Sequence, residues 1–292
     1  MIIYLHGFNS SPASHKARTM ASYMQARGQG GLFACPALPP SPLDAVRTIE
    51  AELARHASSP TLVGSSLGGF YATYFAERLG LRAVLVNPAI TPYVGLEGYL
   101  GTQKNLYTGE TYELTRADLE AWRTLAVERP DPERYLLLLE TGDEILDWRK
   151  AARKYEGART VIRDGGDHTL QSFPEHLPRI LAFAGIAFLV NDYVEAHGAL
   201  KQLTPQDSAV LSSFISSASI TDDDPPVLFA HVDESWELLS EQRRREEAEA
   251  LFDAAKARWG IRDGFIQRGN AMVAQRWANQ LIVFGSLHGE TR

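Results

Sequence analysis

The chain has 292 residues and a formal net charge of −7 at neutral pH, which allows one large domain or a domain with a smaller companion. Hydrophobic residues make up 45% and charged residues 22% of it, as is typical of a soluble globular protein. The acidic balance argues against nucleic acid as a partner, because proteins that bind it usually carry a basic surplus. We therefore expect small molecules as ligands.

The N-terminus and the cysteine content indicate where in the cell the protein is expected and which cross-links or metal sites it could have. The opening MIIYLHGF has no basic residues ahead of its short apolar run, so it does not resemble a secretory signal. No stretch approaches the roughly 18 uninterrupted apolar residues that a membrane span requires. Cys35 is the single cysteine, which rules out an internal disulfide, and the usual zinc-ligand spacings are missing. We expect a cytoplasmic protein with no metal site.

Short apolar runs alternate with helix-period segments over roughly the first 186 residues. Unbroken apolar runs are typical of strands buried on both faces, and the alternation predicts a mostly parallel sheet with helices on both faces. Ligands bind such sheets at the carboxyl ends of the strands. The expected strands are Ile2–Leu5, Thr61–Val63, Arg82–Val86, Tyr135–Leu139 and Thr160–Arg163, and the expected helices are His15–Arg27, Leu43–His56, Leu67–Leu79, Leu119–Val127, Trp148–Tyr155 and Leu177–Ala184.

Two regions do not follow this alternation. The aromatic-rich segment Asn87–Pro132 is too long for a simple crossover, and it is either a helical excursion with its own core or a lid over a pocket. Later in the chain, TDDDPP at Thr221–Pro226 reads as a polar loop without calcium-ligand spacing. A mixed-charge amphipathic pattern then predicts a long helix closed by Gly260. We expect 1–186 to form one domain and 187–292 a mainly helical extension whose role and protein partner are open.

The stretch VGSSLGG contains the pattern Gly-x-Ser-x-Gly directly between an apolar strand and a helix. Gly64 and Gly68 lie two residues either side of Ser66. A serine on a very tight strand-to-helix turn has a strained backbone, and side chains at the flanking positions would collide with the neighbouring strand and helix. The pattern predicts that Ser66, rather than Ser65, is a nucleophile.

A nucleophilic serine needs a base, and the base needs an acid that fixes its tautomer. His168 lies in a glycine loop between an expected strand and the last helix of the first domain. Asp143 follows a strand and a glycine, from which its carboxylate can reach the histidine, whereas Asp147 is the expected N-cap of the next helix. Asp164 and Asp167 are the alternatives for the acid. The order Ser, Asp, His is typical of α/β-hydrolases.

An acyl-transfer site also needs two donors aimed at the developing oxyanion. The backbone N–H of Leu67 follows the nucleophile at the start of a helix. In LHGF, after the first strand, the N–H of Phe8 is the second candidate, with Gly7 permitting a close backbone approach. For His6 we expect a structural hydrogen bond that shapes this loop rather than a catalytic role.

Several short blocks follow one another in a distinctive order over about the first 186 residues. They are YLHGFNSSP at Tyr4–Pro12, PALPP at Pro36–Pro40, GSSLGGFYAT at Gly64–Thr73, VNPA at Val86–Ala89, TGDEILDWR at Thr141–Arg149 and GGDH at Gly165–His168. In these blocks the chain resembles the YqiA esterase family of bacterial α/β-hydrolases. The resemblance implies an α/β-hydrolase fold and a cytoplasmic hydrolase of carboxylic esters or thioesters, with Ser66, Asp143 and His168 as triad and with no cofactor.

The chain departs from this family in two places. Leu170 stands where the family tends to have phenylalanine, which affects the pocket rather than the chemistry, and nothing after residue 186 resembles the family. The same triad also serves the cleavage of amides, lactones and carbon–carbon bonds. A non-catalytic binding or scaffold protein on a hydrolase frame is the alternative from another class, and a C-terminal extension that caps the active site is a further possibility.

Overall fold

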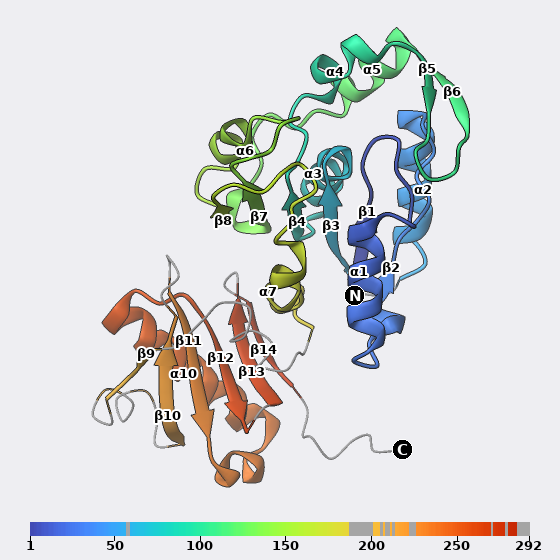
Figure 1. The fold of residues 1–292 in the computed structure, drawn as a ribbon. Helices are drawn as coiled ribbons and strands as arrows, with labels where there is room; N and C mark the ends of the chain where they lie inside the picture. The colour runs from blue at the N-terminus through green and yellow to red at the C-terminus, as the bar shows by residue number, and fades with distance from the viewer. Residues whose placement is uncertain are drawn as a thin grey trace. The chain divides into compact units, whose positions relative to one another are not determined.

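The computed structural model describes residues 1–56, 59–186, 201–204, 207, 211, 214–221, 226–269, 271–277 and 280–284. The chain forms two compact units, Met1–Leu177 and Pro178–Arg292 (Figure 1). The division falls at the start of helix α7 (Leu177–Phe183), which the sequence places at the end of the first domain. Each unit has a sheet and a hydrophobic core of its own.

The first unit is built on a six-stranded sheet in the order β2-β1-β3-β4-β7-β8. Every pair of neighbouring strands is parallel, which confirms the expected parallel sheet. Strand β2 has only two half-buried residues, so no apolar run marked it in the sequence. The strands are β1 (Ile2–Leu5), β2 (Phe33–Ala34), β3 (Thr61–Ser65), β4 (Ala83–Val86), β7 (Tyr135–Glu140) and β8 (Arg159–Arg163).

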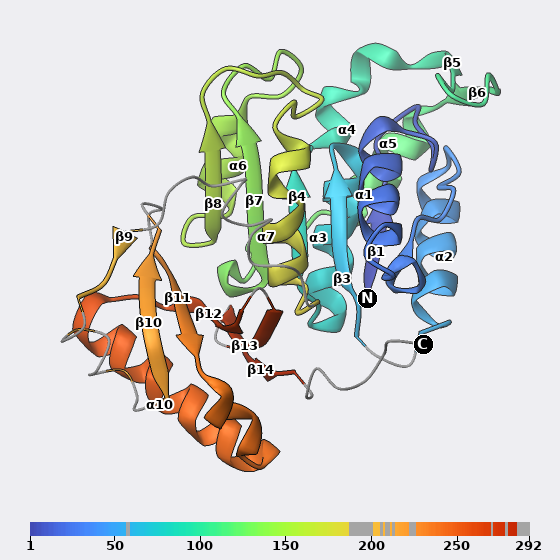
Figure 2. The same ribbon diagram turned by 60° about the horizontal axis from the view of Figure 1, so that its bottom comes forward.

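Helices cover both faces of this sheet (Figure 2). Alternate residues of β1 point to opposite faces: Ile3 and Leu5 belong to the core formed with four of the helices, while Tyr4 packs edge-on against Phe173 with the ring centroids 6.5 Å apart. Phe173 begins a short 3-10 helix that contacts α1. The helices on the first face are α2 (Pro42–Leu53), α3 (Leu67–Leu79), α5 (Arg116–Thr124) and α6 (Trp148–Lys154), and α1 (His15–Gln25) lies on the other.

The long segment Asn87–Pro132 combines helices with a β-hairpin, so the expected helical excursion is only part of it. It contains α4 (Pro92–Gly95), the paired strands β5 (Gly101–Lys104) and β6 (Thr111–Leu114), and α5. The indole of Trp122 is fully buried and donates to the hydroxyl of Tyr71 at 2.7 Å. This tryptophan therefore extends the core of the first unit.

The second unit corrects the expectation of a mainly helical extension. Six strands form a sheet in the order β14-β13-β12-β11-β10-β9, and the long predicted helix, α10 (Glu241–Trp259), packs on it and ends at Gly260 with φ 70°. One amphipathic helix buries a single stripe, so the apolar runs on either side of it pair as strands. The strands are β9 (Lys201–Gln202), β10 (Ile215–Ile220), β11 (Val227–Val232), β12 (Asp263–Arg268), β13 (Ala271–Trp277) and β14 (Gln280–Val283).

The pairing in the second sheet is mixed. Strands β11 and β12 are parallel and are joined through α10, while the other neighbours are antiparallel. Most of the predicted TDDDPP loop, 222–225, lies outside the described residues.

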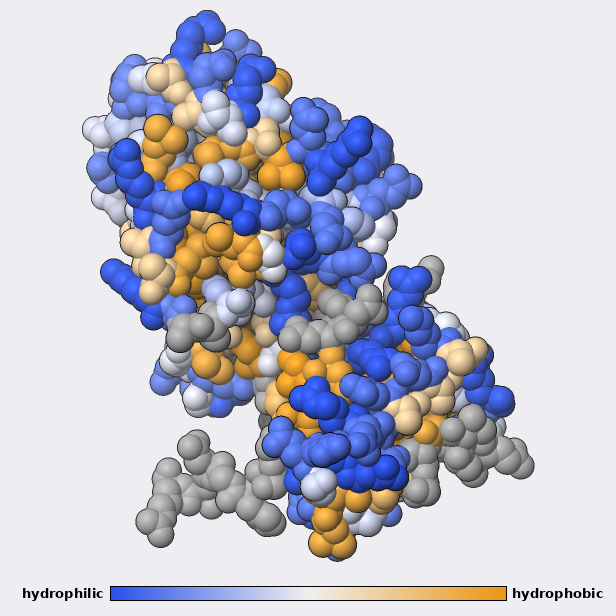
Figure 3. Space-filling model, turned by 180° about the vertical axis from the view of Figure 1, so that it is seen from behind, coloured by the Kyte–Doolittle hydropathy of each residue, from blue (hydrophilic) through white to orange (hydrophobic). Residues whose placement is uncertain are grey.

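Hydrophilic residues surround smaller hydrophobic patches on the face of the molecule drawn in Figure 3. In the described part of the chain, every helix is too short or too polar to cross a lipid bilayer. Over the same residues, no group of histidine, cysteine and acidic side chains is arranged to hold a metal ion. Cys35 is a half-buried free thiol.

Candidate active site

Ser66 lies at the tip of a sharp turn between β3 and α3. Its backbone angles are φ 54° and ψ −119°, a conformation that residues other than glycine rarely adopt and that is typical of functional sites. A Cβ on Gly64 would overlap the carbonyl group of Gly68, and a Cβ on Gly68 would overlap the carbonyl oxygen of Leu5. The two glycines therefore permit the close packing of helix and strands that holds the serine in this position.

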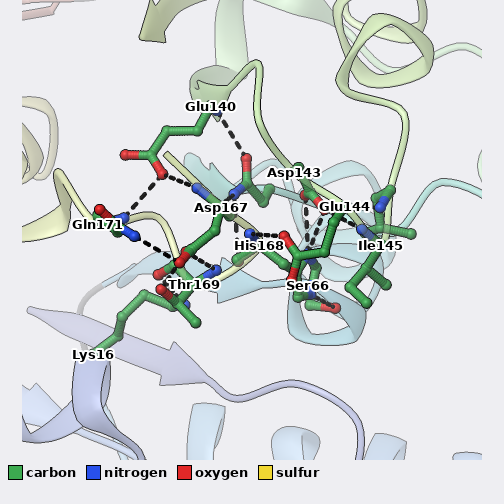
Figure 4. A network of polar contacts seen from close by, with 12 residues as sticks. Lys16, Ser66, Glu140, Asp143, Glu144, Ile145, Asp167, His168, Thr169 and Gln171 are labelled. Atoms are coloured by element: carbon green, nitrogen blue, oxygen red, sulfur yellow. Dashed lines mark hydrogen bonds and ion pairs between the residues drawn. The ribbon is translucent and has the colours of Figure 1, made fainter. Parts of the chain in front are cut away.

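The imidazole of His168 lies between Ser66 and Asp143 (Figure 4). Its Nε2 is 3.1 Å from Ser66 Oγ, and its Nδ1 is 3.0 and 2.9 Å from the two carboxylate oxygens of Asp143. The Asp143 side chain is 1% exposed and that of His168 22%. The three residues predicted as nucleophile, base and acid thus form one hydrogen-bonded chain at the carboxyl ends of β3, β7 and β8.

The other carboxylates considered for the acid have different partners. Asp147 caps α6 by accepting from the N–H of Arg149 at 3.1 Å, as predicted. Asp164 accepts from the hydroxyl of Thr141 at 2.8 Å. Asp167 accepts from the N–H of Thr169 at 2.8 Å, which bends the loop one residue beyond the histidine. Of the carboxylates in the described residues, only that of Asp143 forms hydrogen bonds with the His168 ring.

A buried carboxylate, Glu140, fixes the loop that carries His168. It is 2% exposed at the end of β7 and accepts from the N–H groups of Asp167 and Gln171, both at 2.9 Å. It also accepts from the N–H and the hydroxyl of Ser172, at 2.8 and 2.6 Å. Burial by itself would raise the pKa of Glu140, but the four hydrogen bonds together hold it below its ordinary value.

Asn87 fastens the same loop from the end of β4. Its side chain is buried, donates to the backbone oxygens of Asp167 and His168 at 3.1 and 3.3 Å, and accepts from the N–H of Glu140 at 3.1 Å. Glu144 accepts from the N–H of His168 at 2.9 Å. In the sequence, Glu140 and Glu144 are candidates only for the acid, and Asn87 has no expected role. The available signal for Asn87 was a polar residue at the end of an apolar strand.

The loop after β1 passes close beside Ser66. A Cβ on Gly7 would lie 3.3 Å from the Cβ of Ser66. In the described part of the chain, the N–H groups of Phe8 and Leu67 donate to no protein acceptor. His6 has a structural position: its Nε2 accepts from the N–H of Leu38 at 3.0 Å, and burial lowers its pKa.

A cleft with a volume of about 590 Å³ opens beside Ser66 and His168. The β5–β6 hairpin contributes Leu106 and Tyr107 to its wall, and the side chain of Leu106 is 81% exposed. The hairpin is held to the Phe8 loop because the N–H of Leu106 donates to the Asn9 carbonyl at 3.0 Å. The segment that was expected to be either an excursion or a lid therefore forms part of the cleft wall.

A parallel sheet with a serine elbow after β3, an acid after β7 and a histidine after β8 defines the α/β-hydrolase class. The model of an uncharacterised protein family, UPF0227, matches residues 1–185. The chain belongs to this family, which confirms the family resemblance inferred from the sequence blocks.

Relatives and similar structures cover the same part of the chain. A UPF0227 protein of Citrobacter koseri and the UPF0227 protein YcfP of Salmonella gallinarum are each 27% identical over 190 residues, 63% of this chain and 98% of their own length. A putative hydrolase from Agrobacterium vitis is 20% identical and has a TM-score of 0.49, covering 63% of this chain and 87% of that chain. The mouse α/β-hydrolase domain-containing protein 10 is 18% identical with the same TM-score, covering 61% and 87%.

Proposed function

We propose that this protein is a serine hydrolase that cleaves carboxylic esters or thioesters through an acyl-enzyme on Ser66. The observation that carries the proposal is the hydrogen-bonded chain from Ser66 through His168 to Asp143 beside an open cleft. The hydrolase domain of this proposal is 1–186, because the family match continues through α7 to residue 185. The proposal assigns the remaining residues, 187–292, to an extension of this domain.

In the proposed mechanism each of these groups has a role. His168 Nε2 takes the proton of Ser66 as Oγ attacks the substrate carbonyl carbon, and Asp143 stabilises the imidazolium that results. The N–H groups of Phe8 and Leu67 donate to the oxyanion. The tetrahedral intermediate then expels the alcohol or thiol, which takes the proton from His168. In the second half, His168 deprotonates a water molecule as its oxygen attacks the acyl carbon. The bond between that carbon and Ser66 Oγ then breaks, Oγ takes the proton back from His168, and the carboxylic acid leaves.

Replacement of the nucleophile tests this proposal. We expect Ser66→Ala to lower kcat for p-nitrophenyl butyrate by at least about 1000-fold, because the nucleophile is lost while binding is kept. A fluorophosphonate probe should label the wild type and not this variant. Ser65→Ala, one residue earlier, should keep the labelling.

Two results would contradict the proposal. Undiminished turnover by Ser66→Ala, in a variant that unfolds like the wild type, would show that the serine is not the nucleophile. A folded wild type that neither reacts with the probe nor hydrolyses any ester or thioester would favour the non-catalytic alternative.

A further inference from the structure

The N-terminus of α1 forms part of the wall of the Ser66 cleft. Ser14, His15 and Lys16 line this cleft together with Ser66 and His168. The first N–H groups of a helix have no acceptor within the helix and carry partial positive charge. The first turn of α1 holds no acidic residue and no side-chain cap. The hydrogen-bond donors at this end of α1 therefore lie beside the cleft without a compensating acidic residue or cap.

The N-cap residue Ser14 adds a polar atom that has no protein partner. Ser14 is 9% exposed, and within the described chain its hydroxyl makes no hydrogen bond. Most serine N-caps accept a hydrogen bond from the helix that they precede, and a buried hydroxyl left without a partner destabilises the folded state. A ligand in the cleft that accepts from this hydroxyl would remove that destabilisation.

Lys16 brings a full positive charge to the same place. Its Nζ donates to the carbonyl oxygen of Thr169 at 2.6 Å, one residue beyond His168 (Figure 4). An ammonium group has three N–H donors, so two are left for a ligand. Burial lowers the pKa of Lys16 to about 8, against the charges of Asp167, Glu140 and Asp143. The group therefore stays mostly protonated at neutral pH.

The nearby carboxylates do not neutralise Lys16 by contact. Asp143 is bound to His168, Glu140 accepts four hydrogen bonds from its loop, and Asp167 accepts from Thr169. No carboxylate oxygen of the described residues forms an ion pair with Nζ. The ammonium group is thus held in the cleft by a neutral carbonyl.

We propose that Ser14, Lys16 and the first N–H groups of α1 form an anion subsite of the active-site cleft. The inference rests on the proposed esterase function and names its substrate class: an ester or thioester that also carries a carboxylate or phosphate group. The anion binds at the α1 wall, and the carbonyl carbon lies at Ser66. The subsite thereby fixes the substrate at both ends, which orients the reacting bond.

The anionic group can belong to the acyl chain or to the leaving group. Two pairs of substrates, each with a charged and a neutral member, distinguish these two possibilities. For an acyl chain that ends in a carboxylate, mono-p-nitrophenyl adipate is compared with its neutral methyl ester. For a phosphate in the leaving group, butyryl-4′-phosphopantetheine is compared with butyryl-pantetheine. Release of p-nitrophenol or thiol is measured for the wild type, Lys16→Met, Ser14→Ala and the control Lys150→Met, which removes an exposed lysine of α6.

We expect the wild type to prefer the charged member of at least one pair. Lys16→Met should lower kcat/KM for that substrate by about 10-fold or more, mainly through KM, because a charge-assisted contact is lost. The neutral partner should change by no more than about twofold, since it never makes this contact. Ser14→Ala should act in the same direction, and Lys150→Met should leave both substrates unchanged.

Two outcomes would overturn the subsite. A wild type that treats charged and neutral members alike would show that no anion is recognised. An equal loss for both members in Lys16→Met would show that the lysine only positions the Thr169 loop.

A binding measurement separates failure of the subsite from failure of the esterase function. Calorimetry with Ser66→Ala and with Ser66→Ala/Lys16→Met uses 4′-phosphopantetheine and adipate as probes. Binding that requires Lys16 supports the subsite even if the wild type hydrolyses no ester. Equal binding, or no binding of either probe, would contradict the subsite whatever the fate of the esterase assay.

Discussion

The carboxylate of Glu140 accepts four hydrogen bonds from the loop that carries His168. Replacing it by an amide therefore tests whether these bonds stabilise the loop and position the histidine. The two carboxylate oxygens accept these bonds at 2.6 to 2.9 Å. Glu140→Gln keeps the size of the side chain but turns one oxygen into an NH₂ group. That group faces the N–H groups of Asp167 and Gln171 in one orientation and accepts from neither. In the other orientation it faces the N–H of Ser172, from which it cannot accept, and the hydroxyl of Ser172, to which it can donate.

The expected loss is large for a nearly isosteric change. Hydrogen bonds to a charged group contribute about 1.5–3 kcal/mol each, so losing at least one of them, with the charge removed from the others, should lower the free energy of unfolding of the first unit by about 1.5 kcal/mol or more. The loop also positions the imidazole that contacts Ser66. Because misplacement by about 1 Å can cost about 100-fold in rate, kcat for p-nitrophenyl butyrate should fall by at least about 10-fold.

The pH dependence gives a second readout with a defined sign. Hydrogen bonds hold the pKa of Glu140 below its ordinary value of 4.5 in the folded protein. The folded state then binds this proton less readily than the unfolded state, so the contribution is present above pH 4.5 and is lost as the pH falls through the lower folded pKa. Glu140→Gln has no carboxyl group to protonate at this position, so it should lose less stability than the wild type as the pH falls below 4.5.

Urea unfolding followed by tryptophan fluorescence at neutral and acidic pH measures both effects. Glu144→Gln is the matched control: Glu144 is exposed and accepts one hydrogen bond from His168, which an amide oxygen can also accept. We expect its unfolding midpoint to stay near that of the wild type. If Glu140→Gln unfolds at the wild-type urea concentration and keeps full activity, then Glu140 does not hold the His168 loop in place.

Two further predictions concern the residues around the elbow. Gly68→Ala should prevent folding or strongly destabilise the first unit in thermal unfolding, because its Cβ would overlap backbone atoms of β1. Gly98→Ala is the control and should unfold like the wild type, because a Cβ there meets no atom within 4 Å. Burial lowers the pKa of His6 below its ordinary 6.5, so stability should fall as the pH drops below about 6.5. In urea unfolding between pH 7 and pH 5, His6→Gln should show a shallower fall than the wild type, and an unchanged slope would contradict this account.

The parts of this protein that could be predicted from its sequence depend on local rules of backbone conformation. A parallel sheet follows from alternating apolar runs and helix periods, and the elbow at Ser66 follows from two glycines at fixed spacing between a strand and a helix. Strand-end positions also selected Asp143 and His168 from many acids and histidines. These features are local because each depends on backbone conformation within a few residues.

Contacts between groups far apart in the sequence depend on how the whole unit folds. His168 contacts Ser66 across 102 residues of sequence and Asn87 across 81, and no local pattern fixes such pairs. The roles of Glu140 and Lys16 likewise depend on where the loop after β8 folds back. In the second unit, one strong helical pattern obscured six strands, because strand pairing is a long-range property while helix periodicity is local.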